Sequence, residues 1–259
     1  MTEPAGAFFK TKDIVDHYRY RPPYPAGVYD RIVASAPGTG CLVDLGCGEG
    51  KLARPMTDVF DQVVAIDPSE HMLRLGKALP KGRAQNIRWV KALAETAPLP
   101  DAIDVVTFGS SIHWMDPIRL FPRLKKRLNE EHILVVIEGD EPFLPPWHDD
   151  WREFLSRWVP EMTGRALDAE EWIAWRNRHL DHMEVIHACD ELSDPIKQSL
   201  DEFVLCQHSR DTFATIKLGE RIAAFQDEFV KLLRPHADDA GLLEFRVKSR
   251  VTLARLVTL

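Results

Sequence analysis

The chain has 259 residues and a formal net charge of −7, a length that suits one large domain or one domain with a sizeable insertion. Hydrophobic residues make up 45% and charged residues 28% of the chain, which is ordinary for a globular protein and excludes a disordered or fibrous one. The negative balance argues against a surface that coats nucleic acid, and apolar runs such as Ile133 to Ile137 are far too short to cross a membrane.

The N-terminal sequence and the cysteines bear on the compartment of the protein. The opening MTEPAGAFFKTKD carries an acid and no basic residue before its apolar residues, so we do not expect a signal peptide. Four cysteines without a CxxC pair make neither a disulfide scaffold nor a structural zinc site. We therefore expect a reduced, cytoplasmic protein that holds no metal and has no nucleic-acid or membrane partner.

Short apolar runs alternate with longer segments from about residue 38. The runs are rich in Val and Ile on both faces, which is typical of buried parallel strands, and the segments between them are long enough for crossover helices. Ser69 is a plausible N-cap of the second helix. The expected strands are Cys41–Leu45, Gln62–Asp67, Ile87–Lys91, Ile103–Gly109 and 132–138, and the expected helices are 49–60, 69–79 and 117–128.

This alternation ends after Glu138. Residues 140–180 hold four prolines and five of the seven tryptophans and predict helices without strands. Residues 199–233 are also mostly helical in pattern, whereas 183–189 predicts a sixth strand and 245–258 a closing strand that can pair antiparallel. Together these elements predict an α/β fold with a doubly wound, Rossmann-like, mostly parallel seven-stranded sheet and an inserted helical lid.

The predicted elements divide the chain into three parts. A leader precedes the first strand, a sheet core follows it, and two helical excursions form the lid. The leader is 1–37, the core is 38–140 completed by 181–192 and 243–259, and the lid comprises 141–180 and 195–240.

A glycine-rich loop, VDLGCGEG at 43–50, follows the first expected strand. Glycines there let the backbone turn tightly and approach a ligand closely. A dinucleotide-binding loop has its third glycine at position 51, where this chain has Lys51. Asp67 ends the next strand, 21 residues after Gly46, where a carboxylate can bind both hydroxyls of a ribose. Asp44 and Glu49 flank the loop, which disfavours a phosphate and tolerates a cationic nucleoside.

Three motifs resemble those of class I S-adenosylmethionine-dependent methyltransferases. They are VDLGCGEG at 43–50, AIDPSEHM at 65–72 and ALAETAPLPDAIDVVTFGSSIHWMDP at 92–117. The subgroup is the small-molecule methyltransferases related to trans-aconitate methyltransferase, whose leader is similar to HYRYRPPYP at 17–25. The resemblance covers about residues 8–140. It implies S-adenosylmethionine as cofactor and transfer of a methyl group to a small organic acceptor.

The resemblance also implies which residues hold the adenosine part of the cofactor. Asp67 would bind the ribose, and Pro68 would lie near the adenine. Ala94 and Glu95 match the pair that meets the adenine ring before the fourth strand. Leu93 stands where the family often has a polar residue, so one adenine hydrogen bond is not expected. The alternative for Asp67 is a capping acid at the start of the helix that follows.

A second group of residues would surround the methionine part of the cofactor. The glycine loop would frame it from below, and the residue after the fourth strand would face its end. Two leader residues would fold over the cofactor and contact its carboxylate or the acceptor. Alternatively, the leader tyrosines Tyr18, Tyr20 and Tyr24 with their prolines merely pin the N-terminus. The residues of this second group are Asp44, Gly46, Gly48, Ser110, Tyr18 and Arg21.

His113, three residues past Ser110, is the candidate general base. A sulfonium methyl is already activated, so an in-line displacement depends mainly on alignment and leaves no obligatory catalytic motif. A base is required only when the acceptor has a high pKa, as an alcohol does, and a carboxylate acceptor needs none. The His-Trp pair recurs in the subgroup, which favours a structural or lid role for His113.

The predicted lid is the candidate acceptor site. Its aromatic rings either grip an apolar or planar acceptor or staple the lid to the sheet, and we expect Trp147, Trp151 and the helices around His208 to enclose the acceptor. Its arginines would favour an acceptor with a carboxylate. They are Arg152, Arg157, Arg165, Arg176 and Arg178. We therefore expect a small-molecule acceptor that undergoes O- or N-methylation. We expect the protein itself to be a monomer or a homodimer.

Three other functions fit an α/β fold of this kind. A nicotinamide-dependent oxidoreductase would need the third glycine that Lys51 replaces. A non-catalytic binding module would have no need of the intact Gly46, Gly48 and Asp67. An aminopropyl transferase related to spermidine synthase would need an acidic set after the fourth strand, which is missing.

Overall fold

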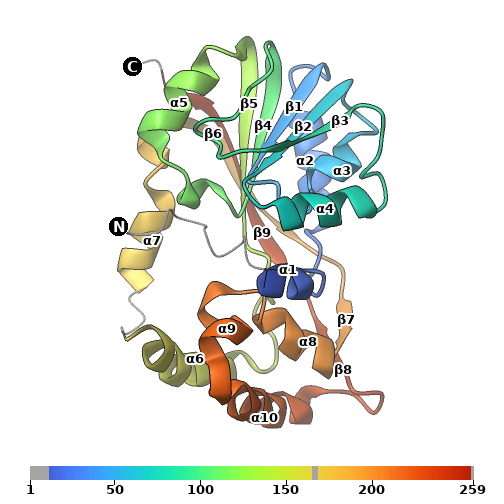
Figure 1. Ribbon diagram of the computed structural model, residues 1–259, viewed down its shortest axis with the longest axis vertical. Coiled ribbons are helices and arrows are strands. Elements are labelled where there is room, and N and C mark those ends of the chain that lie inside the picture. Colours follow the sequence, from blue (N-terminus) through green and yellow to red (C-terminus); the bar gives the residue numbers. More distant parts are fainter. Residues whose placement is uncertain (1–11, 165–168, 258–259) are drawn as a thin grey trace.

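The computed structural model describes residues 12–164 and 169–257. Its upper lobe is a seven-stranded sheet in the order β3-β2-β1-β4-β5-β9-β6 (Figure 1). Strands β1 to β5 run parallel, and β9 is antiparallel to both of its neighbours. The strands are β1 Cys41–Leu45, β2 Gln62–Asp67, β3 Ile87–Lys91, β4 Ile103–Gly109, β5 Leu128–Glu138, β6 Met183–Leu192 and β9 Lys248–Leu256. The predicted mostly parallel seven-stranded sheet is confirmed.

Helices cover both faces of this sheet, as a doubly wound fold requires. One face packs against α2 (Ala26–Ser35), α3 (Ala53–Met56) and α4 (Glu70–Ala78), and the other packs against α5 (Pro117–Lys125). All five residues of β1 are buried, because both of its faces meet a hydrophobic cluster. Continuous burial explains why this strand is apolar at every position except Asp44.

The first four predicted strands have the bounds that the structure gives, and β5 begins four residues earlier than predicted. Ser69 is confirmed as the N-cap of α4, since its hydroxyl accepts from the Met72 amide. The predicted helix over 49–60 is wrong, because only Ala53–Met56 is α-helical. Pro55 has no N–H to donate to the Lys51 carbonyl, which instead accepts from the Tyr29 hydroxyl at 3.3 Å.

The lower lobe is mainly helical and has a hydrophobic core of its own (Figure 1). A two-stranded antiparallel sheet of β7 (Ile196–Ser199) and β8 (Leu242–Phe245), which the sequence did not predict, completes it. The predicted closing strand over 245–258 is wrong at its start. Phe245 packs in the lower core, and the chain re-enters the large sheet only at Lys248. The lobe's α-helices are α6 His148–Thr163, α8 Leu200–Gln207, α9 Thr215–Leu218 and α10 Ile222–Leu233.

Two further helices lie at the junction of the lobes (Figure 1). Helix α1 (Lys12–Tyr18) packs against α4 of the upper lobe and α8 and α9 of the lower one. Helix α7 (Ala169–Asn177) contacts the short 3₁₀ helix Ile112–Trp114, which follows β4. In 12–164 and 169–257, no helix combines the length and the apolar character needed to span a membrane. Residues 1–11 of the predicted leader and Arg165 of the predicted lid lie outside the described residues.

Candidate functional site

A cavity of about 300 Å³ lies at the carboxyl ends of β1, β2 and β4. In a doubly wound sheet this is the crevice where ligands bind, beside the point at which the strand order reverses. The structure brings together nine of the ten residues that the sequence predicted to surround a cofactor. The nine that line the cavity are Tyr18, Arg21, Gly46, Gly48, Asp67, Pro68, Ala94, Glu95 and Ser110.

The glycine loop forms the floor of the cavity. The amides of Gly46 and Cys47 both donate to the Ile66 carbonyl, at 2.9 and 3.0 Å, which fixes the loop against β2. Gly46 has φ +68°, and a Cβ there would lie 2.5 Å from the Cβ of Ser111. Gly48 has φ +54°, and a Cβ there would meet only the Tyr18 side chain, with the hydroxyl oxygen at 3.7 Å. Backbone conformation therefore selects glycine at both positions, and at Gly48 the backbone is open to a ligand.

Asp67 is held rigidly at the edge of this floor. One carboxylate oxygen accepts from the Gly48 amide at 2.9 Å, and the other accepts from the Ser69 amide at 2.7 Å. Burial raises the pKa of Asp67 to about 6, although the two amide bonds oppose this shift. A carboxylate offers about four acceptor positions, so two remain for a ligand. Because Ser69 caps α4, the alternative of Asp67 as the cap is not supported.

Asp44 is the predicted residue that does not line the cavity. It lies beneath the loop and is 1% exposed. Its two oxygens accept from the Thr107 hydroxyl at 2.9 Å and from the Ala53 amide at 3.2 Å. Burial raises the pKa of Asp44 to about 7 against the effect of these hydrogen bonds. The side chain thus joins β1, β4 and the start of α3 under the site.

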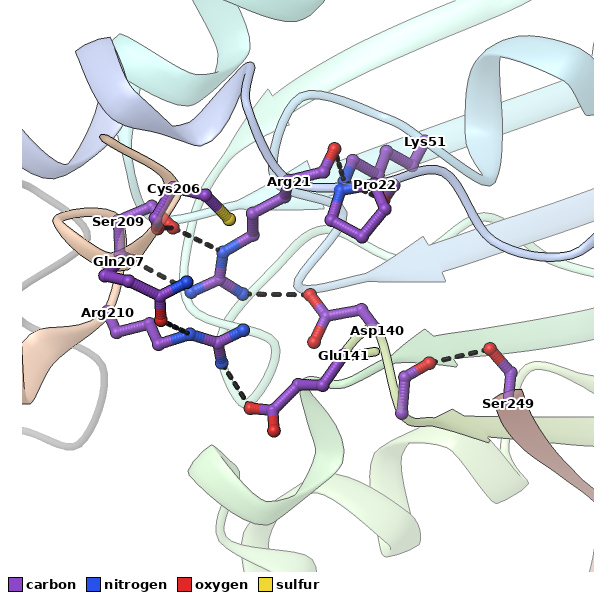
Figure 2. Close-up of polar contacts among 11 residues, drawn as sticks. Arg21, Pro22, Lys51, Asp140, Glu141, Cys206, Gln207, Ser209, Arg210 and Ser249 are labelled. Carbon is purple, nitrogen blue, oxygen red and sulfur yellow. Dashed lines mark hydrogen bonds and ion pairs between the residues drawn. The ribbon is translucent and has the colours of Figure 1, made fainter. Parts of the chain in front are cut away.

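The leader forms one wall of the cavity through Tyr18 and Arg21. The Arg21 guanidinium lies over the Tyr18 ring, 4.8 Å from its centroid, and the ammonium of Lys51 lies 5.2 Å from the same ring. Arg21 also bonds to Asp140 and Ser209, which come from distant parts of the chain (Figure 2). Burial raises the pKa of the Tyr18 hydroxyl, so this phenol stays neutral.

The cavity is also lined by residues for which the sequence analysis predicted no contact with the cofactor. Most of them lie inside or next to the recognised motifs, so their position in the sequence was the one indication that they could line the site. Arg178 is the exception, because it follows α7 in the predicted lid and reaches the cavity only through the fold. Its Nη2 donates to the carbonyls of Met115 at 2.8 Å and His113 at 3.3 Å. Arg178 was one of the lid arginines expected to favour an acceptor with a carboxylate. The other lining residues outside the predicted cofactor set are Met72, Leu93, Gly109, Ser111, Trp114, Met115, Asp116 and Arg119.

His113 is buried beside the cavity and is not part of its wall. Its ring packs 5.0 Å from Trp114 and 4.9 Å from Trp175 of α7. Burial lowers the pKa of His113 to about 3, and the nearby positive charges of Arg176 and Arg178 act in the same direction. A histidine with so low a pKa is a weak base at neutral pH.

The three predicted lid residues lie in the core of the lower lobe and do not line the cavity. Trp147 is 1% exposed and contacts Phe203 and Phe245 edge-on. Trp151 packs on aromatic residues of α6 and α10, and His208 hydrogen-bonds to the Phe213 carbonyl. The two tryptophans pack in a core that both helical segments of the predicted lid share.

In the part of the chain that the structure describes, no group of three or more His, Cys, Asp and Glu side chains is placed to hold a metal ion. The polar residues that line the cavity are three acids, three hydroxyl residues and three arginines: Asp67, Glu95, Asp116, Tyr18, Ser110, Ser111, Arg21, Arg119 and Arg178.

A family described as "Methyltransferase domain" matches residues 43–136. A "Probable S-adenosylmethionine-dependent methyltransferase" of Saccharomyces cerevisiae is 33% identical over 121 residues, which are 44% of this chain and 42% of that protein. An uncharacterized methyltransferase of Mycobacterium tuberculosis is 35% identical over 144 residues, which are 53% of this chain and 69% of that protein. The chain spans about half the length of the first curated relatives it matches.

A solved structure from Anaeromyxobacter dehalogenans, assigned to the type II methyltransferases, has the same fold. Its TM-score is 0.68 at 20% identity, and the match covers 90% of this chain and 96% of that one.

Proposed function

The chain belongs to the class I S-adenosylmethionine-dependent methyltransferases, and on that premise we propose that it methylates a small organic acceptor by in-line displacement. S-adenosylmethionine is the cofactor of this family. The finer assignment that we propose is the small-molecule subgroup related to trans-aconitate methyltransferase. The observation that carries the proposal is the cavity at the carboxyl ends of β1, β2 and β4, with the fixed carboxylate of Asp67 in its wall.

The residues around the cavity fit this cofactor. Asp67 keeps two acceptor positions for the ribose hydroxyls, and the Gly48 backbone is open beside it. The apolar side chains of Met72 and Leu93, with Ala94, offer a surface for the adenine. When bound, S-adenosylmethionine supplies a methyl group that its sulfonium already activates. The protein's own part is to bind, to align and to exclude water.

The methionine part would lie against the glycine loop, the leader and the end of β4. Gly46, Gly48 and Ser110 line this side of the cavity, and Tyr18 and Arg21 close it. We propose that Arg21 contacts the cofactor carboxylate. Asp44 supports the loop from below through its bonds to Thr107 and Ala53, and so acts on the site without lining it.

We propose that the acceptor lies against Trp114 and Arg178 and carries a carboxylate. Among the arginines of the predicted lid that the structure describes, only Arg178 lines the cavity. Its Nη2 is used by two carbonyls, whereas its Nε and Nη1 have no hydrogen-bond partner within the described ranges. A guanidinium with unused donors suits a carboxylate. Methylation of a carboxylate needs no general base, in keeping with the low pKa of His113.

The direct test is to incubate the purified protein with S-adenosylmethionine carrying an isotopically labelled methyl group and a metabolite extract. Mass spectrometry should find a labelled small molecule together with S-adenosylhomocysteine. Absence of any labelled product, with no affinity for S-adenosylhomocysteine by calorimetry, would contradict the proposal.

The variant Asp67→Ala tests the cofactor site. It removes two hydrogen bonds from the ribose hydroxyls to a charged acceptor, each worth about 1.5–3 kcal/mol, so affinity for S-adenosylhomocysteine should fall about a hundredfold. Titration calorimetry measures this. Glu70→Gln, on an exposed acid at the start of α4, is the matched control and should bind as the native protein does. Unchanged affinity in Asp67→Ala would remove this residue from the site.

A further inference from the structure

One guanidinium joins the leader, the sheet and the lower lobe (Figure 2). Arg21 follows α1, and its Nε donates to the Ser209 hydroxyl while its Nη2 donates to the Ser209 carbonyl, both at 2.8 Å. Its Nη1 donates to Asp140, just after β5, at 3.1 Å. Arg21 lines the cavity, whereas Ser209 and Asp140 do not.

These contacts are buried. The side chains of Arg21 and Asp140 are only 10% and 13% exposed, and Ser209 is fully buried. Burial raises the pKa of Asp140, but the positive charges of Arg21, Arg210 and Lys51 outweigh this effect and hold the pKa at about 2. Asp140 is therefore ionised at neutral pH and pairs with Arg21 in a region that excludes water.

The contacts also fix the orientation of the guanidinium. The edge formed by Nε and Nη2 pairs with two oxygens of the same residue, Ser209, and the flat face lies over the Tyr18 ring. An arginine has five N–H donors, of which three are used here. The two that remain, one on each Nη, have no partner within 12–164 and 169–257 and are held in one orientation at the cavity wall.

We propose that Ser209 and Asp140 are positioning residues for cofactor binding, and that through Arg21 the lower lobe contributes to cofactor affinity. This inference rests on the proposed function, since it assumes that S-adenosylmethionine occupies the cavity. A donor that is already oriented loses less freedom on binding than a mobile one. Ser209 therefore acts on the ligand from outside the cavity.

A second link between the same segments provides a matched control. The Arg210 guanidinium, next to Ser209, pairs with Glu141, next to Asp140 (Figure 2). The Glu141 side chain is 58% exposed and makes no hydrogen bond to Arg21, whose acidic partner is Asp140. Glu141→Gln therefore weakens a tether between the lobes and leaves the three hydrogen bonds of Arg21 in place.

The experiment is titration calorimetry with S-adenosylhomocysteine, below the unfolding temperature of each variant. Ser209→Ala should bind about tenfold more weakly, because Arg21 loses one of the three hydrogen bonds that orient it. Glu141→Gln should stay within about twofold of the native protein, since an exposed pair contributes little. Equal affinity in Ser209→Ala and the native protein, whatever the change in thermal stability, would overturn the inference.

A double variant separates positioning from general stability. Arg21→Lys cannot pair side-on with Ser209, so in that background Ser209→Ala should cost no further affinity. If the two losses of affinity multiply instead, Ser209 does not act through Arg21. If the native protein itself does not bind S-adenosylhomocysteine, that result counts against the proposed function and not against the roles of Ser209 and Asp140.

Hydrogen exchange on the native protein gives a measurement that needs no variant. S-adenosylhomocysteine should slow exchange of the amides around 205–210 at the end of α8, in addition to those of 17–22. Protection confined to the cavity-lining segments of the upper lobe would contradict a contribution from the lower lobe.

Discussion

The two acids of the glycine loop region differ in what they face. Asp67 reaches the cavity, whereas Asp44 is enclosed by protein. Burial raises the pKa of each, to about 6 and about 7. Ionising a buried carboxyl costs free energy. The geometry of this site therefore lowers the stability of the fold at pH values above these pKa values.

This cost predicts an unusual pH dependence of stability. Asp44 has a folded pKa of about 7, above its ordinary value. The stability that the protonated carboxyl contributes is therefore fully present in acid and is lost as pH rises through 7. Asp44→Asn should therefore be more stable than the native protein at pH 8 by roughly 2–4 kcal/mol, with little gain at pH 4. The asparagine can donate to Thr107 and accept from the Ala53 amide, so both bonds persist. Urea unfolding at the two pH values measures the difference, and an equal change at both would contradict the prediction.

His113 permits a prediction at the same scale. Because its ring lies outside the cavity wall with a pKa of about 3, it should not act as the general base. His113→Asn should lower turnover by less than about tenfold, since a lost base costs 10²–10⁴-fold. It should also weaken thermal stability through the lost packing on Trp114 and Trp175. A hundredfold fall in turnover with unchanged cofactor affinity would restore the base role.

Among the elements, α7 links the lower lobe to the cavity. Trp175 packs edge-on against Trp114 at 5.0 Å, and Arg178, just past the helix, binds two carbonyls of the 113–115 turn. The Arg176 guanidinium pairs with Glu138 at the end of β5 at 3.1 Å. These contacts hold Arg178 at the cavity wall.

Arg178→Gln should therefore alter acceptor binding more than cofactor binding. The KM for the acceptor should rise about tenfold or more, since a charge-assisted bond is worth about 1.5–3 kcal/mol, while affinity for S-adenosylhomocysteine stays within about twofold. Steady-state kinetics and calorimetry together measure the split. Arg152→Gln, on the exposed face of α6, is the control and should change neither. Equal losses of both affinities would place Arg178 in the cofactor site.

Elements whose signal is local were predictable from the sequence. Strand β1 is an apolar run because both faces are buried, and the Ser69 cap is encoded within three residues. The helix over 49–60 failed because Pro55 and a competing bond from Tyr29 shorten it, and only the proline is visible in the sequence. Contacts between distant segments gave no local signal. Arg178 reaches the cavity from just past α7, 69 residues beyond the end of β4, and β7 pairs with β8 across the segment that holds α8, α9 and α10.

At the scale of the whole molecule, the two lobes have separate hydrophobic cores, which are joined by polar contacts and by the packing of α1 and α7 at the junction. The sheet has one apolar cluster on each face, and a third cluster fills the lower lobe. Arg21, Arg210 and Arg178 supply bonds across the junction. Separate cores with polar links favour relative motion or separate unfolding of the lobes.

A cavity in the lower core should make this separation visible. Phe225 is fully buried and packs on rings from α6, α10 and the 3₁₀ helix Asp211–Phe213. Phe225→Ala should destabilise the lower lobe by about 3–5 kcal/mol, because the large ring leaves a void. The tryptophans Trp147, Trp151 and Trp158 lie in or against this core, so fluorescence should report its melting at a lower temperature than the loss of circular dichroism, which follows both lobes. Phe143→Ala, at a ring that is 37% exposed, is the control and should leave the two signals coincident as in the native protein. If both signals of Phe225→Ala shift together in one sharp transition, the lobes unfold as a single unit, and the polar junction couples them more strongly than their separate cores imply.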